Sequence, residues 1–484
     1  MKTNYSQYQT TSAEPIAANM LESFRAVGYS MEAAVADILD NSISAGARNI
    51  WIDFDWKGAD TTFAIKDDGC GMDNDELINA MRPGSKDPNE ERDARDLGRF
   101  GFGLKTASFS QCRKYTVISK KQNNDSCFWT WDLDYIYHHA KKWELIASLP
   151  PGNWQEQIEA LTSGTIVIWQ DMDHLLKDTP VDDTKAKRKF LETMQLVKNH
   201  ISVVFHRYIE NNKVKIYFSD RGIPAWNPFM ITHDATQNFP EEPLCNGQVR
   251  ARGFVLPHKS KLTPEQFKEG EGIRGWNANQ GFYVYRNERM LVSGGWLGLF
   301  RKEEHCKLAR IMIDLPNNLD NEWQIDIKKS VARIPAGLRD QLKAYASEVR
   351  AYAVEVYRHR GKVMQRRSTS SKFEPVWVEM QKDGKRYYEI NQLHPFIAQY
   401  DLKTLRPLIR LLEETLPVPL IVINESENPD SFFRPYEKTP TKELTDLIKT
   451  VYKSLLNNNA PEQAKNRLLL IEPFNEYPEL IESL

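Results

Sequence analysis

The chain has 484 residues, of which 41% are apolar and 27% are charged, and its formal net charge is −2. This length predicts two to four domains, and the apolar fraction suffices for sizeable cores. A net charge near zero argues against a protein that binds nucleic acid over its whole surface, although it allows local basic patches. Five cysteines without a CxxC pair argue against a disulfide scaffold and a zinc site, and they indicate a reducing compartment.

The start of the chain, residues 1–14, is polar and predicts a flexible N-terminal arm. It does not have the pattern of a signal peptide, and no apolar run reaches the roughly 18 residues of a membrane span. We therefore expect a cytoplasmic protein with no membrane segment. A helix from Ile16 to Val27 should follow the arm.

The segment Met31–Ala47 predicts a helix, with Ser30 able to cap its start and Gly46 just beyond its last apolar residue. Asp37 and Asn41 are four residues apart and therefore lie on one face of that helix. A carboxylate one turn from a carboxamide suits a magnesium–nucleotide site, in which the amide oxygen meets the metal and the acid meets a water. Taken alone, such a pair is far more often solvated surface, and the glycine motifs that follow change that interpretation.

A strand-like run, TTFAIKDD, ends at Asp67 and leads into two glycines, Gly69 and Gly71. Glycines there let the backbone turn sharply and approach a ligand closely. An acid at a strand end can accept a hydrogen bond from an exocyclic amine such as that of adenine. The alternative is a plain strand–turn–helix, with Asp73 as the N-cap of the following helix.

The polar, turn-rich segment 82–97 predicts a lid over a bound nucleotide. After it, Gly98, Gly101 and Gly103 followed by Lys105 resemble a glycine-rich phosphate loop that runs into a helix N-terminus. The spacing is not that of a Walker loop, which requires GxxxxGK[ST].

These motifs, followed by Ser-Gly-Thr at 163–165 before the strand TIVIWQ, resemble in order and spacing the GHKL ATPase family, which includes MutL, the ATPase chain of DNA gyrase, heat-shock chaperones, histidine kinases and MORC proteins. DNSISAGA, DDGCGM and GRFGFGLKTAS are most similar to the motifs of MutL and MORC proteins. QGFYVYRNERMLVSGGW at 280–296 is similar to a strand of their transducer region. The resemblance covers roughly residues 20–335. One departure is Asp37, where MutL and MORC proteins usually have glutamate.

The resemblance implies ATP and Mg²⁺ as ligands. It implies that Asp37 orients or deprotonates the attacking water, that Asn41 holds Mg²⁺, and that Lys328, with Lys329 as the alternative, reaches the γ-phosphate. Ser85 and Lys86 resemble the Ser-Lys pair of the family's lid. The nucleotide-binding residues implied are Asn41, Asp67, Gly69, Gly71, Met72, Ser85, Lys86, Gly98, Arg99, Phe100, Gly101, Phe102, Gly103, Leu104, Lys105 and Thr165.

The implied fold class is α+β. A GHKL (Bergerat) ATP-binding sandwich of helices over a mixed sheet should span residues 15–182. A linker helix and an S5-like transducer lobe, which includes the strand-like segment 213–220, should span 183–365. A smaller α+β module at 366–484 should serve dimerisation or partner binding.

The resemblance further implies an ATP-stabilised homodimer that closes on DNA within a restriction or phage-defence system, beside effector proteins. Aspartate is one methylene shorter than glutamate, so its carboxylate falls ~1.5 Å short and hydrolysis should be slow. Residues 339–372 carry nine basic against three acidic residues, which predicts sequence-indifferent contacts to the DNA backbone or, alternatively, a solvated helix face. Two other functions stay open: a non-hydrolysing ATP-gated scaffold and a chaperone-like ATPase of the heat-shock type.

Overall fold

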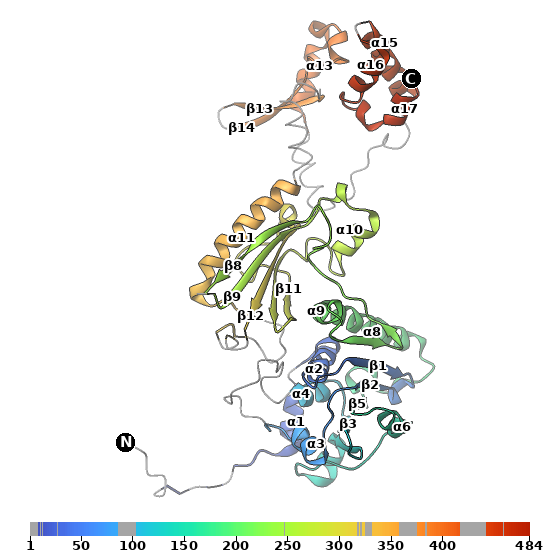
Figure 1. Cartoon of the computed structure of the whole chain (residues 1–484), viewed down its shortest axis with the longest axis vertical. Helices are drawn as coiled ribbons and strands as arrows, with labels where there is room; N and C mark the ends of the chain where they lie inside the picture. The colour runs from blue at the N-terminus through green and yellow to red at the C-terminus, as the bar shows by residue number, and fades with distance from the viewer. Residues whose placement is uncertain are drawn as a thin grey trace. The chain divides into compact units, whose positions relative to one another are not determined.

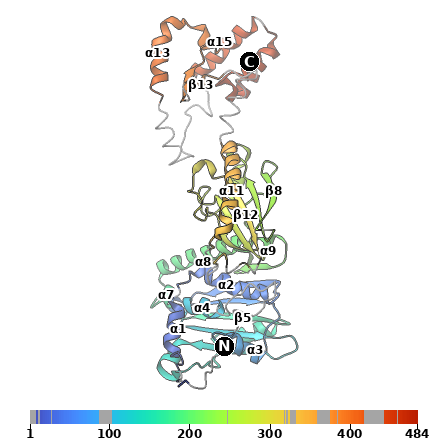
Figure 2. The ribbon, with the colours of Figure 1, turned by 90° about the vertical axis from the view of Figure 1, so that its left-hand side faces the viewer.

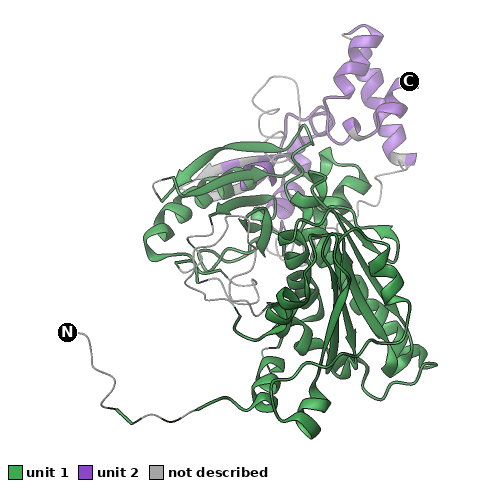
Figure 3. Ribbon diagram, turned by 60° about the horizontal axis from the view of Figure 1, so that its bottom comes forward, with its two compact units in different colours: residues 1–353 green, residues 354–484 purple. Residues whose placement is uncertain are grey.

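The computed structural model describes residues 8–9, 11, 13–26, 28–85, 103–245, 247–316, 319, 322–324, 332–357, 375–382, 385–416, 442–457 and 459–484. The chain divides into two compact units, residues 1–353 and 354–484 (Figure 3). The first unit contains two β-sheets, and the second contains a β-hairpin with helices. None of the helices among the described residues has the length and hydropathy that a bilayer span requires.

The first sheet has seven strands in the order β4-β3-β5-β2-β1-β6-β7. It is mixed, because β6 runs parallel to β1 while the other neighbouring strands are antiparallel. The strands are β1 (Asn49–Asp55), β2 (Thr62–Asp67), β3 (Lys114–Lys120), β4 (Cys127–Asp132), β5 (Gly164–Gln170), β6 (Lys215–Phe218) and β7 (Arg221–Gly222). We expected the β6 segment in the second lobe. That placement is wrong, because Asn49–Ile52 of β1 pair with Lys215–Phe218.

Strand β5 shows why the sheet is apolar on both faces. Val167 and Trp169 pack into a large core, whereas Ile166 and Ile168 pack into a smaller one, as the two-residue period of a strand requires. Figure 1 shows helices on both sides of the sheet. The large core lies under α1 (Ala17–Arg25), α2 (Met31–Ser44), α4 (Gly103–Gln111) and α8 (Thr184–Val204), and the smaller core under α6 (Trp154–Glu159).

Short helices join these elements. Asp73 caps α3 (Asn74–Met81) in a reciprocal capping box with Glu76, and both hydrogen bonds measure 3.0 Å. Ser30 occupies the N-cap position of α2 but makes no side-chain cap hydrogen bond, contrary to our expectation. The others are α5 (Leu133–Tyr135), η2 (Gly58–Asp60), η3 (Ile136–Ala140), α7 (Asp173–Leu176), α9 (His206–Glu210), η4 (Lys259–Lys261), α10 (Pro264–Glu271) and η5 (Glu304–Cys306).

The second sheet has five strands in the order β11-β10-β12-β9-β8, and β10 runs parallel to β12. Helix α11 (Ala336–Tyr357) lies along it (Figure 2). Tyr345 of α11 accepts a hydrogen bond from the Gly253 amide at 2.7 Å, and a Cβ at Gly253 would come within 2.5 Å of Val349. The helix therefore needs glycine at that point of the sheet. The strands are β8 (Gln237–Leu244), β9 (Val249–Val255), β10 (Gly281–Arg286), β11 (Arg289–Ser293) and β12 (Ala309–Leu315).

The second unit begins with the predicted hairpin, in which Trp377–Lys382 (β13) pairs antiparallel with Lys385–Ile390 (β14). Both predicted helices of this region are present, and a small apolar core forms around Ile448, Leu468 and Phe474. The helices are η7 (Ile397–Gln399), α13 (Leu402–Glu414), α15 (Lys442–Leu456), α16 (Pro461–Leu468), η8 (Phe474–Glu476) and α17 (Pro478–Glu482). The predicted α+β class, with helices over a mixed sheet, is confirmed.

Candidate nucleotide site

The carboxylate of Asp67 lies at the end of β2 in a fixed and buried position. Its Oδ2 accepts a hydrogen bond from the Ser42 hydroxyl at 2.7 Å, and its Oδ1 accepts one from the Gly69 amide at 2.9 Å. Burial raises the pKa of Asp67 above its ordinary value, and these hydrogen bonds oppose that rise. Because each oxygen has a second lone pair, the carboxylate can still accept a hydrogen bond from an amine of a ligand.

Thr165 lies beside Asp67, since the two residues pair across β5 and β2. The Thr165 hydroxyl is 3.0 Å from the Ser119 hydroxyl, which also accepts a hydrogen bond from the Met72 amide at 2.9 Å. Ser119 thus connects two of the predicted binding residues, Met72 and Thr165. The first sheet therefore brings these residues together with Asp67.

The glycines after Asp67 have a packing role. Gly71 has φ +64°, and a Cβ there would come within 1.8 Å of the Lys120 carbonyl oxygen. At Gly69 a Cβ would meet the side chain of Ala45 at 2.9 Å. Both glycines are thus explained by close backbone packing within the fold, and their contact with a ligand stays a prediction.

Helix α2 carries Asp37 and Asn41 one turn apart, as predicted. Asn41 is exposed, so its amide can meet a ligand, whereas only 2% of Asp37 is exposed. The Tyr29 hydroxyl donates to Asp37 Oδ2 at 2.9 Å. Mg²⁺ usually takes one or two protein ligands together with substrate phosphates and water, so an exposed amide on this helix fits that ion.

A second acid of α2, Asp40, is buried and faces an arginine of the second sheet. Arg289 Nε of β11 donates to Asp40 Oδ1 at 2.7 Å, and Arg289 Nη2 lies 3.8 Å from Asp37 Oδ1. Asp40 is 1% exposed and Arg289 is 2% exposed. One guanidinium of the second sheet therefore stands against two carboxylates of α2.

The first turn of α4 is the described part of the predicted phosphate loop. Gly103 begins the helix, Leu104 is half-buried, and a Cβ at Gly103 would meet nothing within 4 Å. Lys105 is 2% exposed, and its ammonium donates to the Ala80 carbonyl at 2.8 Å. A contact from Lys105 to a phosphate would have to replace or share that bond.

Several predicted residues lie outside the part of the chain that the structure describes. Ser85 is described and half-buried at the start of the predicted lid. The basic cluster of 358–372 lies outside the described residues. So do eight predicted site residues: Lys86, Gly98, Arg99, Phe100, Gly101, Phe102, Lys328 and Lys329.

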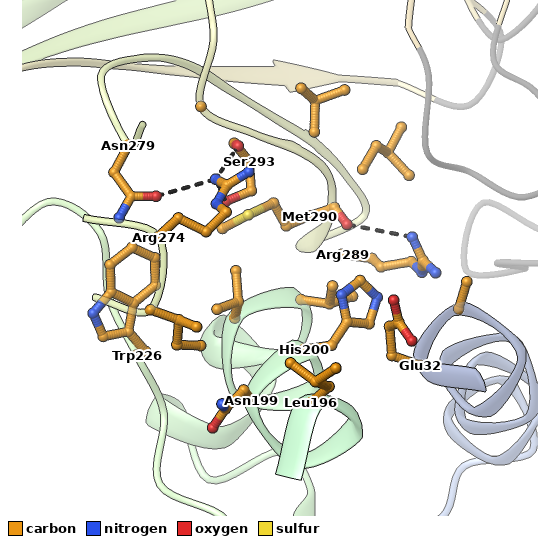
Figure 4. A pocket seen from close by; sticks show the side chains of 17 residues that line it. Glu32, Leu196, Asn199, His200, Trp226, Arg274, Asn279, Arg289, Met290 and Ser293 are labelled. Carbon is orange, nitrogen blue, oxygen red and sulfur yellow. Dashed lines mark hydrogen bonds between the residues drawn. The ribbon is translucent and has the colours of Figure 1, made fainter. Parts of the chain in front are cut away.

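A cavity of about 510 Å³ lies beside Arg289, between α2, α8 and the second sheet (Figure 4). Apolar side chains such as Leu196 and Met290 line much of it, and Arg274 lies toward its other end with bonds to Asn279 and Ser293. Burial lowers the pKa of His200 in its wall to about 4, and the nearby positive charge of Arg289 adds to this effect. The imidazole is therefore neutral at neutral pH.

Comparison with known proteins identifies the class. Residues 29–165 match the family model described as "Histidine kinase-, DNA gyrase B-, and HSP90-like ATPase". That segment holds α2, the Asp67 turn, the start of α4 and Thr165. It is a GHKL ATPase domain, as the sequence motifs predict.

Within that class the chain is similar to MORC and MutL proteins. It is 29% identical over 119 residues to ATPase morc-1 of Caenorhabditis elegans, covering 25% of this chain and 14% of that protein. It is 25% identical over 274 residues to MutL of Pseudoalteromonas translucida, covering 53% of this chain and 38% of that protein. The predicted resemblance to MutL and MORC proteins of the GHKL family is confirmed. The chain spans only 14% and 38% of the lengths of these two relatives.

A solved structure is similar at a greater distance. The ATPase and transducer domains of DNA topoisomerase II from Balamuthia mandrillaris match with a TM-score of 0.39 and 11% identity, over 68% of this chain and 86% of that chain.

Sequence reasoning missed Tyr29, Ser42, Ser119, Asp40 and Arg289. Ser42 could have been found, because it directly follows Asn41 near the end of α2. Its hydroxyl donates to Asp67 at the end of β2. Arg289 lies in the segment 280–296 that resembles a transducer strand, but nothing local indicates its partner Asp40, which is 249 residues away along the chain.

Proposed function

We propose that this protein binds ATP with Mg²⁺, hydrolyses it slowly, and uses the cycle to close and open a homodimer on DNA. One observation carries the nucleotide part. The buried Asp67 carboxylate, bound by Ser42 and the Gly69 amide, lies in the same domain as the exposed amide of Asn41. The match of residues 29–165 to ATPases supports the choice of ATP.

Each residue has a proposed task. Asp67 accepts a hydrogen bond from the adenine amine, and Thr165 lies on the same side of the base. Asn41 would hold Mg²⁺, which neutralises phosphate charge when bound. The glycine-rich loop ending at Gly103, with Lys105, would donate to the phosphates.

Asp37 is proposed to orient or deprotonate the attacking water, and Lys328 to stabilise charge on the γ-phosphate. Two features support slow turnover. The aspartate is one methylene shorter than glutamate, and its carboxylate is already engaged by Tyr29 and stands near Arg289. The same engagement favours the second candidate, an ATP-gated scaffold that does not hydrolyse its nucleotide. A chaperone-like ATPase is the third candidate, and no specific contact favours it.

The dimer, the DNA and the cellular setting are also proposals. MutL and MORC proteins are relatives of this chain, so we infer a cytoplasmic, ATP-stabilised homodimer that acts with effector proteins in a restriction or phage-defence system. In domain terms, we propose an arm at 1–14, an ATP-binding domain at 15–182, a transducer-like domain at 183–365 and a dimerisation or partner module at 366–484.

An ATPase assay with and without duplex DNA separates the two leading candidates. We expect slow, magnesium-dependent release of phosphate that DNA changes, and a non-hydrolysable analogue should shift the mass in solution to that of a dimer. Tight binding of the analogue with no phosphate release would select the non-hydrolysing scaffold. Unchanged mass with the analogue would contradict the clamp.

The DNA contact is proposed for the basic stretch 339–372. Not all of its charge is available, because Arg350 pairs with Glu303 at 3.1 Å and stacks on Phe300. Each phosphate contact contributes about −0.9 to the slope of log K against log salt. Neutralising four basic residues should flatten that slope by roughly two to four units and leave ATP binding unchanged. The four are Arg360, Lys362, Arg366 and Arg367. Superimposable anisotropy curves for the two proteins would overturn this assignment.

A further inference from the structure

The contact between α2 and β11 holds three buried charged groups, two acids of the helix and one arginine of the strand. They are Asp37 and Asp40 of α2 and Arg289 of β11, each no more than 2% exposed. Burying three charges is costly unless they compensate one another. Arg289 is therefore one of the groups that compensate these two acids, and removing it would take away a positive charge beside both of them.

Arg289 is positioned by the tight turn between β10 and β11. Arg286 and Arg289 pair across the β10–β11 hairpin, and the two residues between them have positive φ, +46° at Asn287 and +67° at Glu288. A two-residue turn of this shape matches the twist of its strands, but a left-handed glutamate is unfavourable.

The same hairpin is bound to α9 by one buried and one partly buried hydrogen bond. The Tyr208 hydroxyl donates to the Asn287 carbonyl, at 2.5 Å, and His206 Nε2 lies 2.8 Å from the Tyr285 hydroxyl. Arg207 lies over the Tyr285 ring at 3.6 Å. Tyr208 also packs against the large core of the first sheet, so these contacts hold the Arg289 hairpin in a fixed place beside α2.

We propose that Arg289, which the second sheet supplies, is a positioning residue for hydrolysis: it sets the orientation of the Asp37 carboxylate. Asp40 holds the guanidinium at 2.7 Å, Arg289 reaches Asp37 at 3.8 Å, and Tyr29 fixes the other oxygen of Asp37. Arg289 also lines the cavity between α2, α8 and the second sheet (Figure 4). Loss of the Arg289 contact would then change the orientation of the Asp37 carboxylate without any change at Asp67.

This inference rests on the proposed role of Asp37 as the group that acts on water. The test compares the turnover number for ATP with the dissociation constant of ADP in full-length variants. Arg289→Met removes the charge and keeps much of the volume. Arg289→Lys keeps the charge but cannot span two carboxylates, so its effect should be intermediate. Asp40→Asn loosens the hold on the guanidinium and serves if Arg289→Met does not fold.

A misplacement of about 1 Å can cost roughly a hundredfold in rate, so we expect Arg289→Met to lower turnover by at least about tenfold. The ADP dissociation constant should stay within about twofold of the wild-type value, since Asp67 is untouched. The matched control is Glu288→Gln, on the same turn. It breaks only an exposed pair with Lys213 and should leave both quantities unchanged.

The outcomes separate this inference from the proposed function. Asp37→Asn is measured beside the Arg289 variants. If Asp37→Asn turns over normally, or the wild type does not hydrolyse ATP, the role of Asp37 and this inference fall together. If Asp37→Asn is inactive while Arg289→Met and Asp40→Asn turn over normally, the inference alone is overturned. Equal losses of ADP binding and turnover in the Arg289 variants would also overturn it, because they indicate a purely structural arginine.

Discussion

The buried acids of the first unit form two clusters, Asp67 with its partners and the pair Asp37 and Asp40 with theirs. The two clusters differ in which domain supplies the partners. The carboxylate of Asp67 is bound by Ser42 and Gly69, which belong to the same domain. The carboxylates of Asp37 and Asp40 face Arg289, which the second sheet supplies. The first cluster is therefore complete within the GHKL domain, whereas the second needs the neighbouring sheet. We infer that nucleotide binding is local to the first sheet and that hydrolysis is coupled to the second.

The largest expected effect is at Asp37. An Asp37→Asn variant keeps the shape of the side chain but cannot take a proton, so turnover should fall by about 10²–10⁴-fold. Binding of ADP should persist, because Asp67 is unchanged. Phosphate release and ADP titration measure the two properties, and normal hydrolysis by this variant would contradict the proposed base.

The second-largest effect is expected at Lys328, which follows β12 in the sequence and is proposed to reach the γ-phosphate. Lys328→Ala should lower turnover by about 10²-fold with little change in ADP affinity, because loss of charge stabilisation acts on the γ-phosphate. Neighbouring side chains of an extended segment point in opposite directions, so Lys329→Ala should be nearly silent. The reverse result would exchange the two assignments.

A third variant sharpens the comparison on α2 itself. Asn41→Ala removes the proposed magnesium ligand while leaving Asp37 one turn away. We expect the magnesium-dependent part of nucleotide affinity to fall by about 10–100-fold. Titrating ADP with and without Mg²⁺ isolates that part, and equal magnesium dependence in variant and wild type would contradict this role.

The smallest effect is a pH dependence of binding. Burial raises the pKa of Asp67, so its carboxylate becomes protonated at a higher pH than an ordinary aspartate. The acceptor for an amine is present above that pKa and is lost as the pH falls through it. ADP affinity should therefore weaken by up to about tenfold as the pH falls through that raised pKa. In Asp67→Asn, affinity should be low and nearly constant over the same range; a matching pH slope would assign it to another group.

How much could be predicted from the sequence follows from how local each feature is. The Asp67 strand end, the α2 pair and the capped α3 involve short-range patterns, and the structure places them as expected. The β6 strand was misplaced because its apolar pattern does not say which sheet it joins, and a parallel partner 166 residues earlier decided that. The segment of Arg289 was identified by its resemblance, but its pair with Asp40 was missed, since a buried ion pair between distant segments leaves no local periodicity.

The most direct test of the division between binding and hydrolysis compares Asp67→Asn with Arg289→Met in one experiment. For each full-length protein, the ADP dissociation constant and the ATP turnover number are measured under the same conditions. We predict that Asp67→Asn loses affinity by roughly 10–100-fold, whereas Arg289→Met keeps its affinity and loses turnover. If both variants lost affinity and turnover in the same proportion, the two clusters would act as one site and the division would be wrong.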